Sequence, residues 1–214
     1  MDRNEFANEV LQACRKMQAG GMTVGTWGNI SVRISNESFL ITPSGMSYDS
    51  LDIEDIVMVS MNGQTVNSKR KPSIEHSLHR MIYLARPDVG AVIHTHPQYS
   101  TAFAIAREPI PPVSEELVQI IGEGVRCANY ALPGTKELAV YVVEGLGKNN
   151  AVLLANHGAV CVGESLAGAF KVAEVLEKAA KTIILARIIG TPQIISHEDC
   201  SKMQDFARNH YGQR

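Results

Sequence analysis

The chain has 214 residues, of which 45% are hydrophobic and 20% are charged, and its formal net charge is −2 at pH 7. These values are typical of a globular protein, and the length suits one large domain or two small ones. The longest basic run is Lys69-Arg70-Lys71, which is too short to indicate binding to nucleic acid or to a membrane surface.

Cysteine use and the amino-terminal sequence bear on the cellular compartment. The four cysteines lie far apart and form no C-x-x-C pair; they are Cys14, Cys127, Cys161 and Cys200. Such spacing favours reduced thiols over a disulfide framework or a cysteine zinc site. The amino terminus lacks the apolar segment of a signal peptide, and no apolar run approaches the roughly 18 residues of a membrane helix. We therefore expect a soluble, cytoplasmic protein.

The first third of the chain predicts a helix followed by hairpins. Apolar residues recur at near-helical spacing over residues 2–19, and Gly20-Gly21 ends the pattern. Strands are predicted at residues 30–34, 39–42, 56–61 and 64–66. The turn sequences Asn36-Glu37-Ser38 and Asn62-Gly63 separate them in the way that is typical of hairpins.

The rest of the chain alternates helices and strands. Helices are predicted at residues 73–85, 98–106, 135–146 and 197–210. Another, long helix is predicted to begin at its cap, Ser165, and to end near residue 189. Strands are predicted at residues 89–96, 125–130, 151–155 and 159–162. Hairpins mixed with strand–helix units indicate an α/β fold in one domain, residues 1–214. Its sheet should be mixed, largely antiparallel, and covered by helices on both faces.

Two histidines end the apolar strand in the middle of the chain. Residues two apart on a strand point to the same face, so His94 and His96 should project together. Pro97 follows them and suits the start of the next helix. Two adjacent imidazoles can form half of a metal site. Hydrogen bonding of both rings inside the core is the alternative interpretation.

A third histidine and a glutamate complete a candidate metal site. His157 lies at a strand end beside a glycine, so three imidazoles from two strand ends could converge and leave a position for Glu75. Glu75 lies in the predicted first turn of its helix, where a carboxylate is also favoured by the helix dipole. A rival site would combine Glu75 with His76 and His79, although these three do not share one helix face.

Three short, turn-forming segments are candidates for binding an anion. They are Gly28-Asn29, Ser44-Gly45 and Pro72-Ser73-Ile74. Each is expected to leave backbone N–H groups free, and the last opens a helix. Together they could hold a phosphate with little help from lysine, although glycine loops are most often simple turns.

Five motifs of this sequence resemble, in order and spacing, those of the class II aldolase/adducin family. They are Gly25-Thr-Trp-Gly-Asn-Ile-Ser31, Ile41-Thr-Pro-Ser-Gly45, Pro72-Ser-Ile-Glu75, His94-Thr-His96 and Asn156-His-Gly158. The resemblance covers almost the whole chain. It implies one Zn²⁺ per subunit, bound by His94, His96 and His157. Glu75 would ligate the resting metal and then act as the catalytic acid/base.

The resemblance also implies a substrate and an assembly. A small phosphorylated sugar would be held through its phosphate by Gly28, Asn29, Ser44, Gly45, Ser73 and Ile74. Tyr211 and Arg214 would be catalytic residues that close the site of a neighbouring subunit. The protein would then be a homotetramer with active sites at subunit interfaces.

Two positions depart from the family pattern. Ile74 replaces a serine, so only its backbone N–H could contact phosphate. Glu115 aligns with a catalytic tyrosine, and a carboxylic acid cannot simply replace a phenol whose ordinary pKa is about 10. The second departure bears on the aldehyde half of the substrate.

The reaction that the resemblance implies is reversible aldol cleavage. A ketose 1-phosphate, such as L-fuculose 1-phosphate or a similar deoxy-ketose ester, would give dihydroxyacetone phosphate and a small aldehyde such as lactaldehyde. Pentulose-phosphate 4-epimerases of the family use an aspartate at the place of Glu75, so they resemble this chain less. A sugar-phosphate dehydratase or decarboxylase on the same scaffold stays open. A non-enzymatic adducin-like interaction module is the third alternative, but such modules have lost metal-binding histidines.

Overall fold

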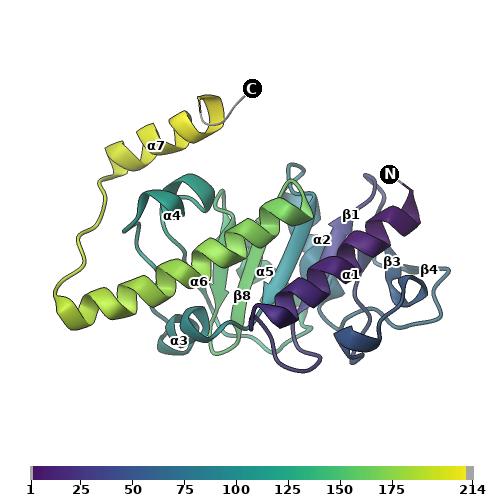
Figure 1. The fold of residues 1–214 in the computed structure, drawn as a ribbon. Helices are drawn as coiled ribbons and strands as arrows, with labels where there is room; N and C mark the ends of the chain where they lie inside the picture. The colour runs from purple at the N-terminus through teal and green to yellow at the C-terminus, as the bar shows by residue number, and fades with distance from the viewer. Residues whose placement is uncertain (1, 211–214) are drawn as a thin grey trace.

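The computed structural model describes residues 2–210, and an eight-stranded sheet forms the centre of that part of the chain (Figure 1). The strand order is β4-β3-β2-β1-β5-β8-β7-β6. The strands are β1 (Asn29–Arg33), β2 (Ser38–Ile41), β3 (Val57–Ser60), β4 (Thr65–Val66), β5 (Ala91–Thr95), β6 (Cys127–Ala128), β7 (Ala151–Leu154) and β8 (Gly158–Gly163). All neighbouring pairs within it are antiparallel except β6 with β7.

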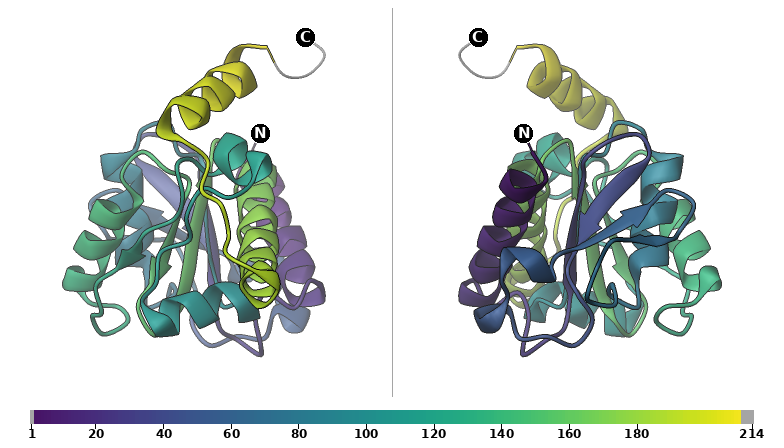
Figure 2. Two further views of the ribbon diagram at one scale, coloured as in Figure 1. Left: turned by 90° about the vertical axis from the view of Figure 1, so that its left-hand side faces the viewer. Right: turned by 90° about the vertical axis from the view of Figure 1, so that its right-hand side faces the viewer.

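Helices cover both faces of this sheet, as Figure 2 shows with the sheet between two helical layers. The helices are α1 (Arg3–Ala19), α2 (His76–Ala85), α3 (Gln98–Ala106), α4 (Glu115–Ile120), α5 (Lys136–Leu146), α6 (Leu166–Ile189) and α7 (His197–Asn209). Two 3₁₀ turns, η1 (Tyr48–Ser50) and η2 (Ile53–Asp55), lie between β2 and β3. One hydrophobic core lies under α1, α3, α4 and α6, and the other lies under α2 and α5.

Local sequence signals account for the long helices. Asp2 caps α1 by accepting hydrogen bonds from the backbone of Asn4 and Glu5, and Glu5 bonds back to Asp2. Ser165 caps α6 by accepting from the backbone N–H of Gly168. No helix in residues 2–210 is long and apolar enough to cross a membrane.

The predicted fold class, a mixed and largely antiparallel sheet with helices on both faces, is confirmed. Among the differences from the sequence prediction, two concern helices. Helix α4 was not predicted, because it is only six residues long and follows an extended connector; Ser114 caps it. The predicted helix at 73–85 begins at His76 instead, because Pro72 and Ser73 are held in an extended segment beside Thr42 and Pro43.

Candidate active site

The carboxyl end of β5 and the tight turn between β7 and β8 bring three histidines together. β5 and β8 pair with Thr95 opposite Ala159, so the turn that carries His157 lies beside His96. The turn leaves no room for a side chain at Gly158, where a Cβ atom would lie 2.5 Å from the Thr95 carbonyl oxygen and 2.8 Å from His96 Cδ2. This close packing fixes the two strand ends relative to each other.

The three imidazoles face each other through their Nε2 atoms. His94 Nε2 lies 2.9 Å from His96 Nε2 and 3.2 Å from His157 Nε2. His94 Nδ1 donates a hydrogen bond of 2.9 Å to the Ala159 carbonyl, so the neutral ring presents a bare lone pair at Nε2. His157 Nδ1 is buried and has no hydrogen-bond partner in residues 2–210.

Burial keeps these rings uncharged. Burial is the largest cause that lowers the pKa of His94 to about 4, of His96 to about 3 and of His157 to about 4; for the last two the neighbouring rings contribute to this shift. Neutral imidazoles whose lone pairs converge repel each other unless a cation lies between them. The donor set therefore fits a metal ion.

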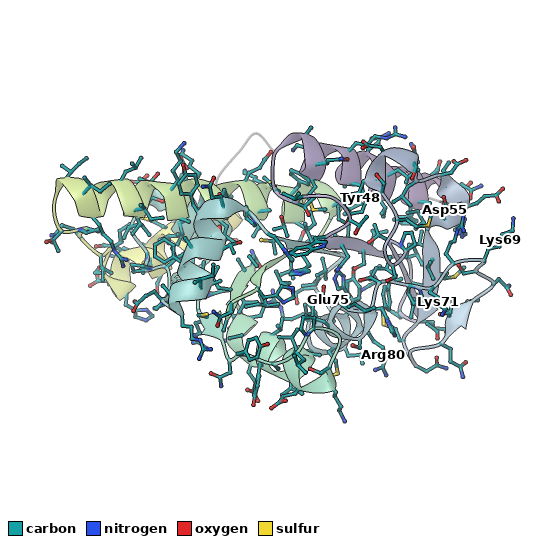
Figure 3. The ribbon with its side chains drawn as sticks, turned by 90° about the horizontal axis from the view of Figure 1, so that it is seen from below. Tyr48, Asp55, Lys69, Lys71, Glu75 and Arg80 are labelled. Carbon is teal, nitrogen blue, oxygen red and sulfur yellow. The ribbon has the colours of Figure 1, made fainter. Side chains whose placement is uncertain are left out.

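Glu75 borders the three rings. Its side chain is buried between the two helical layers (Figure 3). Oε2 lies 3.3 Å from His94 Nε2, and Oε1 lies 3.8 Å from His157 Nε2. Glu75 occupies the N-cap position of α2 rather than its predicted first turn, and its carboxylate makes no capping bond there. The carboxylate is consequently free to face the histidines, and Oε1 has no hydrogen-bond partner in the described chain.

The rival set of Glu75, His76 and His79 does not converge. His79 is fully buried and bonds to Asn29 and Ser31, on the sheet side of α2. His76 Nδ1 donates to the Ser73 carbonyl at 2.9 Å. Within residues 2–210, the group that could hold a metal consists of His94, His96 and His157.

The candidate anion loops lie next to each other, but they offer fewer backbone donors than expected. The Ser44 N–H bonds to the Lys71 carbonyl and the Ser73 N–H bonds to the Thr42 carbonyl, each at 3.0 Å, because the two segments pair with each other. The N–H groups of Gly45 and Ile74 make no hydrogen bond within the described residues. Lys69 lies at the outer edge of the molecule, away from Glu75 (Figure 3).

Asn29 links the anion loops to Glu75. Its Nδ2 donates to Glu75 Oε2 at 2.8 Å, and the side chain is buried. Gly28, directly before it, has a φ of 76° and approaches the His94 carbonyl so closely that a Cβ would lie 2.7 Å from that oxygen. Asn29 was predicted to contact phosphate, but its contact with Glu75 was not predicted.

Sequence reasoning also missed Trp27 as a neighbour of the metal site. Its ring lies edge-on to His96 with 5.8 Å between ring centroids, and it is 67% exposed. Ile74, next to Glu75, is exposed as well. Trp27 belongs to a motif in which only Gly28 and Asn29 were candidate site residues.

Tyr211, Arg214 and Glu115 are the remaining residues that the sequence singled out. Tyr211 and Arg214 lie outside the residues that the structure describes. Glu115 is exposed in the first turn of α4, a helix that packs against α6 and α7.

A hollow of about 1020 Å³ lies at the end of the strands opposite to the histidines. It includes residues that precede β5 and β7. Arg86 in its wall is paired with Asp88 and bonds to the carbonyls of Gly147 and Asn149. Arg86 therefore stabilises the loops that it joins.

The fold and site define a class of proteins in which the ends of central strands carry three histidines that could hold a metal ion, beside a buried glutamate. The family model described as "Class II Aldolase and Adducin N-terminal domain" matches residues 8–184. The chain belongs to the class II aldolase/adducin family.

Similar proteins have been named for sugar-phosphate cleavage. The chain is 36% identical to a 5-deoxy-D-ribulose 1-phosphate aldolase of Bacillus thuringiensis, over 96% of each chain. It is 34% identical to the L-fuculose phosphate aldolase of Escherichia coli, over 93% of this chain and 92% of that one. A solved L-fuculose 1-phosphate aldolase superposes with a TM-score of 0.92 at 36% identity, covering 95% of this chain and 96% of the other.

Proposed function

We propose that this protein is a metal-dependent aldolase that reversibly cleaves a ketose 1-phosphate to dihydroxyacetone phosphate and a small aldehyde. One observation carries the proposal: three uncharged imidazole Nε2 atoms converge beside the buried carboxylate of Glu75. The relatives named as ketose 1-phosphate aldolases support it.

His94, His96, His157 and Glu75 would hold the metal, and three nitrogens with one oxygen suit Zn²⁺. A bound zinc supplies Lewis-acid stabilisation of the negative charge that develops as the carbon–carbon bond breaks. His94 keeps its ring orientation through the Ala159 carbonyl.

Glu75 is the acid/base of this proposal. In cleavage it gives a proton to the carbon of dihydroxyacetone phosphate that has lost its bond, and in synthesis it removes that proton. Its Oε1, which accepts no hydrogen bond within residues 2–210, is the atom best suited to this exchange, because Oε2 is held by Asn29.

The substrate phosphate would bind between the three loops. Asn29 Nδ2, the hydroxyls of Ser44 and Ser73 and the N–H groups of Gly45 and Ile74 are the donors we assign to it, with Gly28 allowing close approach. Neutral donors of this kind can bind a phosphate dianion without a lysine in the binding site.

The aldehyde end would meet apolar surface. Trp27 is exposed beside His96, so it suits the methyl end of a deoxy-ketose better than a terminal hydroxyl. L-fuculose 1-phosphate and 5-deoxyribulose 1-phosphate, the substrates named for the relatives, both fit this chemistry.

We further propose a cytoplasmic homotetramer in which one domain spans residues 1–214 and active sites lie at subunit interfaces. Tyr211 would donate a proton to the aldehyde oxygen of a neighbouring site, in place of the tyrosine that Glu115 replaces. Arg214 would add positive charge near the phosphate.

A panel of ketose 1-phosphates tests this proposal, with release of dihydroxyacetone phosphate as the readout. The zinc-loaded protein should cleave L-fuculose 1-phosphate, 5-deoxyribulose 1-phosphate or both, and should act poorly on the unphosphorylated sugars. Epimerised or dehydrated products without dihydroxyacetone phosphate would refute aldol cleavage, and no reaction with the whole panel would refute the substrate class.

A further inference from the structure

A continuous line of hydrogen bonds runs from Glu75 into the core between α2 and β1. Asn29 Nδ2 bonds to Glu75 Oε2 at 2.8 Å, and Asn29 Oδ1 lies 2.6 Å from His79 Nε2. His79 Nδ1 lies 2.6 Å from Ser31 Oγ, which lies 2.7 Å from the Tyr83 hydroxyl. All five side chains are buried.

The spacing of these residues along α2 and β1 produces this line of hydrogen bonds. His79 and Tyr83 follow Glu75 by four and eight residues, so they extend along one face of α2. Asn29 and Ser31 are two apart on β1 and therefore point to the same side of the sheet. The helix and the strand meet through these polar groups in an otherwise apolar layer.

The protonation states determine which atom donates and which accepts in each hydrogen bond of this line. Burial lowers the pKa of His79 well below 6.5, so the ring is neutral and carries a single N–H. Burial raises the pKa of Tyr83, so its hydroxyl keeps its proton. If Glu75 is ionised, the Asn29 amide must turn its NH₂ toward the carboxylate and its oxygen toward His79.

The positions of the remaining hydrogens follow from this orientation of the Asn29 amide. His79 must carry its proton on Nε2, which donates to Asn29 Oδ1. Its Nδ1 accepts from the Ser31 hydroxyl, and Ser31 Oγ accepts from Tyr83. The opposite order would point the Asn29 oxygen at a buried carboxylate and leave two acceptors facing each other.

We propose that His79 is a positioning residue of the active site: its Nε2–H fixes the Asn29 amide, which in turn holds Glu75 against the three histidines. The inference rests on the proposed function and adds residues that do not touch the substrate. Because an amide has two N–H groups, Asn29 can hold Glu75 with one and a substrate phosphate with the other. The line would thus set the distance between the acid/base and the phosphate.

A purely structural role would give a different result. In that case the line would only satisfy polar groups that the core has buried, and its loss would lower stability without altering turnover. Ser100 provides the matched control, because it is also a fully buried serine whose hydroxyl bonds to one side chain, Glu177.

The first test is kinetic. His79→Leu removes the donor and should lower kcat for cleavage and for dihydroxyacetone phosphate proton exchange about 10²-fold, the scale of a misplacement of about 1 Å. KM should rise because Asn29 is also freed. His79→Gln, which can place an amide N–H near the position of Nε2, should recover most of the activity. Ser31→Ala and the milder Tyr83→Phe should lower kcat in the same direction, and Ser100→Ala should not.

The second test does not depend on activity. Nitrogen-15 NMR of histidine-labelled, zinc-loaded protein identifies which ring nitrogen of His79 carries the proton. An Nε2–H tautomer supports the proposal, and an Nδ1–H tautomer overturns it. Equal kcat in the wild type, His79→Leu and Ser100→Ala proteins would also overturn it. If the wild-type protein cleaves no ketose phosphate, the proposed function fails while the tautomer still decides the direction of the line.

Discussion

Adding one methyl group at Gly158 should disable the metal site although Gly158 is not a ligand. A Cβ atom there would lie 2.5 Å from the Thr95 carbonyl oxygen and 2.8 Å from His96 Cδ2. Ordinary contact begins at 3.4 Å, so the backbone of β5 and the turn must separate by 3.4 − 2.5, or about 0.9 Å. That separation moves His157 away from His94 and His96. We expect Gly158→Ala to cost about 1–3 kcal/mol of stability through overpacking and to lower turnover about 10²-fold.

The assay compares zinc affinity, by competition with a chelator, and cleavage rate in Gly158→Ala and in Gly168→Ala. The control glycine lies in α6, where an added Cβ meets its nearest atom at 3.5 Å. Gly168→Ala should keep zinc and activity and gain up to about 1 kcal/mol from helix propensity. Unchanged zinc affinity and turnover in Gly158→Ala would refute the idea that close packing of the two strand ends builds the site.

Three further predictions follow from the site. Burial lowers the pKa of His94 from 6.5 to about 4. Between these two pH values, His94 is therefore protonated in the unfolded chain but not in the folded chain. The free energy of unfolding of the metal-free protein should therefore fall as pH falls from about 6.5 to about 4, by up to about 1.4 kcal/mol per pH unit for this residue; urea melts with a flat profile would contradict it. Glu75→Gln should fold and bind zinc through the histidines, yet exchange the dihydroxyacetone phosphate proton about 10²-fold more slowly; near-normal exchange in deuterated solvent would remove Glu75 as the acid/base. Deleting residues 211–214 should leave folding and zinc intact and lower cleavage at least about 10²-fold while proton exchange suffers less; equal loss of both would mean that the tail organises the whole site.

Much of the fold could be predicted because its signals are local. The Ser165 cap and the Gly190 stop bound α6, and Pro97 immediately precedes α3. The alternation that brings His94 and His96 to one face is a property of any strand. Convergence of His157 on the pair needed one further inference, namely that two strand ends meet at the same edge of the sheet.

The features of the site that could not be predicted from the sequence depend on pairing between segments that are distant in the chain. The bridge between Pro43 and Pro72 uses the N–H groups of Ser44 and Ser73, which sequence reasoning took to be free for an anion. The sequence suggested Glu75, four residues earlier, as the hydrogen-bond partner of His79; its actual partners Asn29 and Ser31 lie about 50 residues away in sequence and could not be identified from it.

Zinc titration of the wild-type protein and of His157→Ala tests the central claim most directly. The account predicts one tightly bound zinc per wild-type chain and its loss, together with cleavage activity, in His157→Ala. His76→Ala should titrate like the wild type, since His76 bonds to the Ser73 carbonyl and does not belong to the histidine cluster. A full zinc complement in His157→Ala would contradict the assignment of the metal site, and with it the proposed reaction.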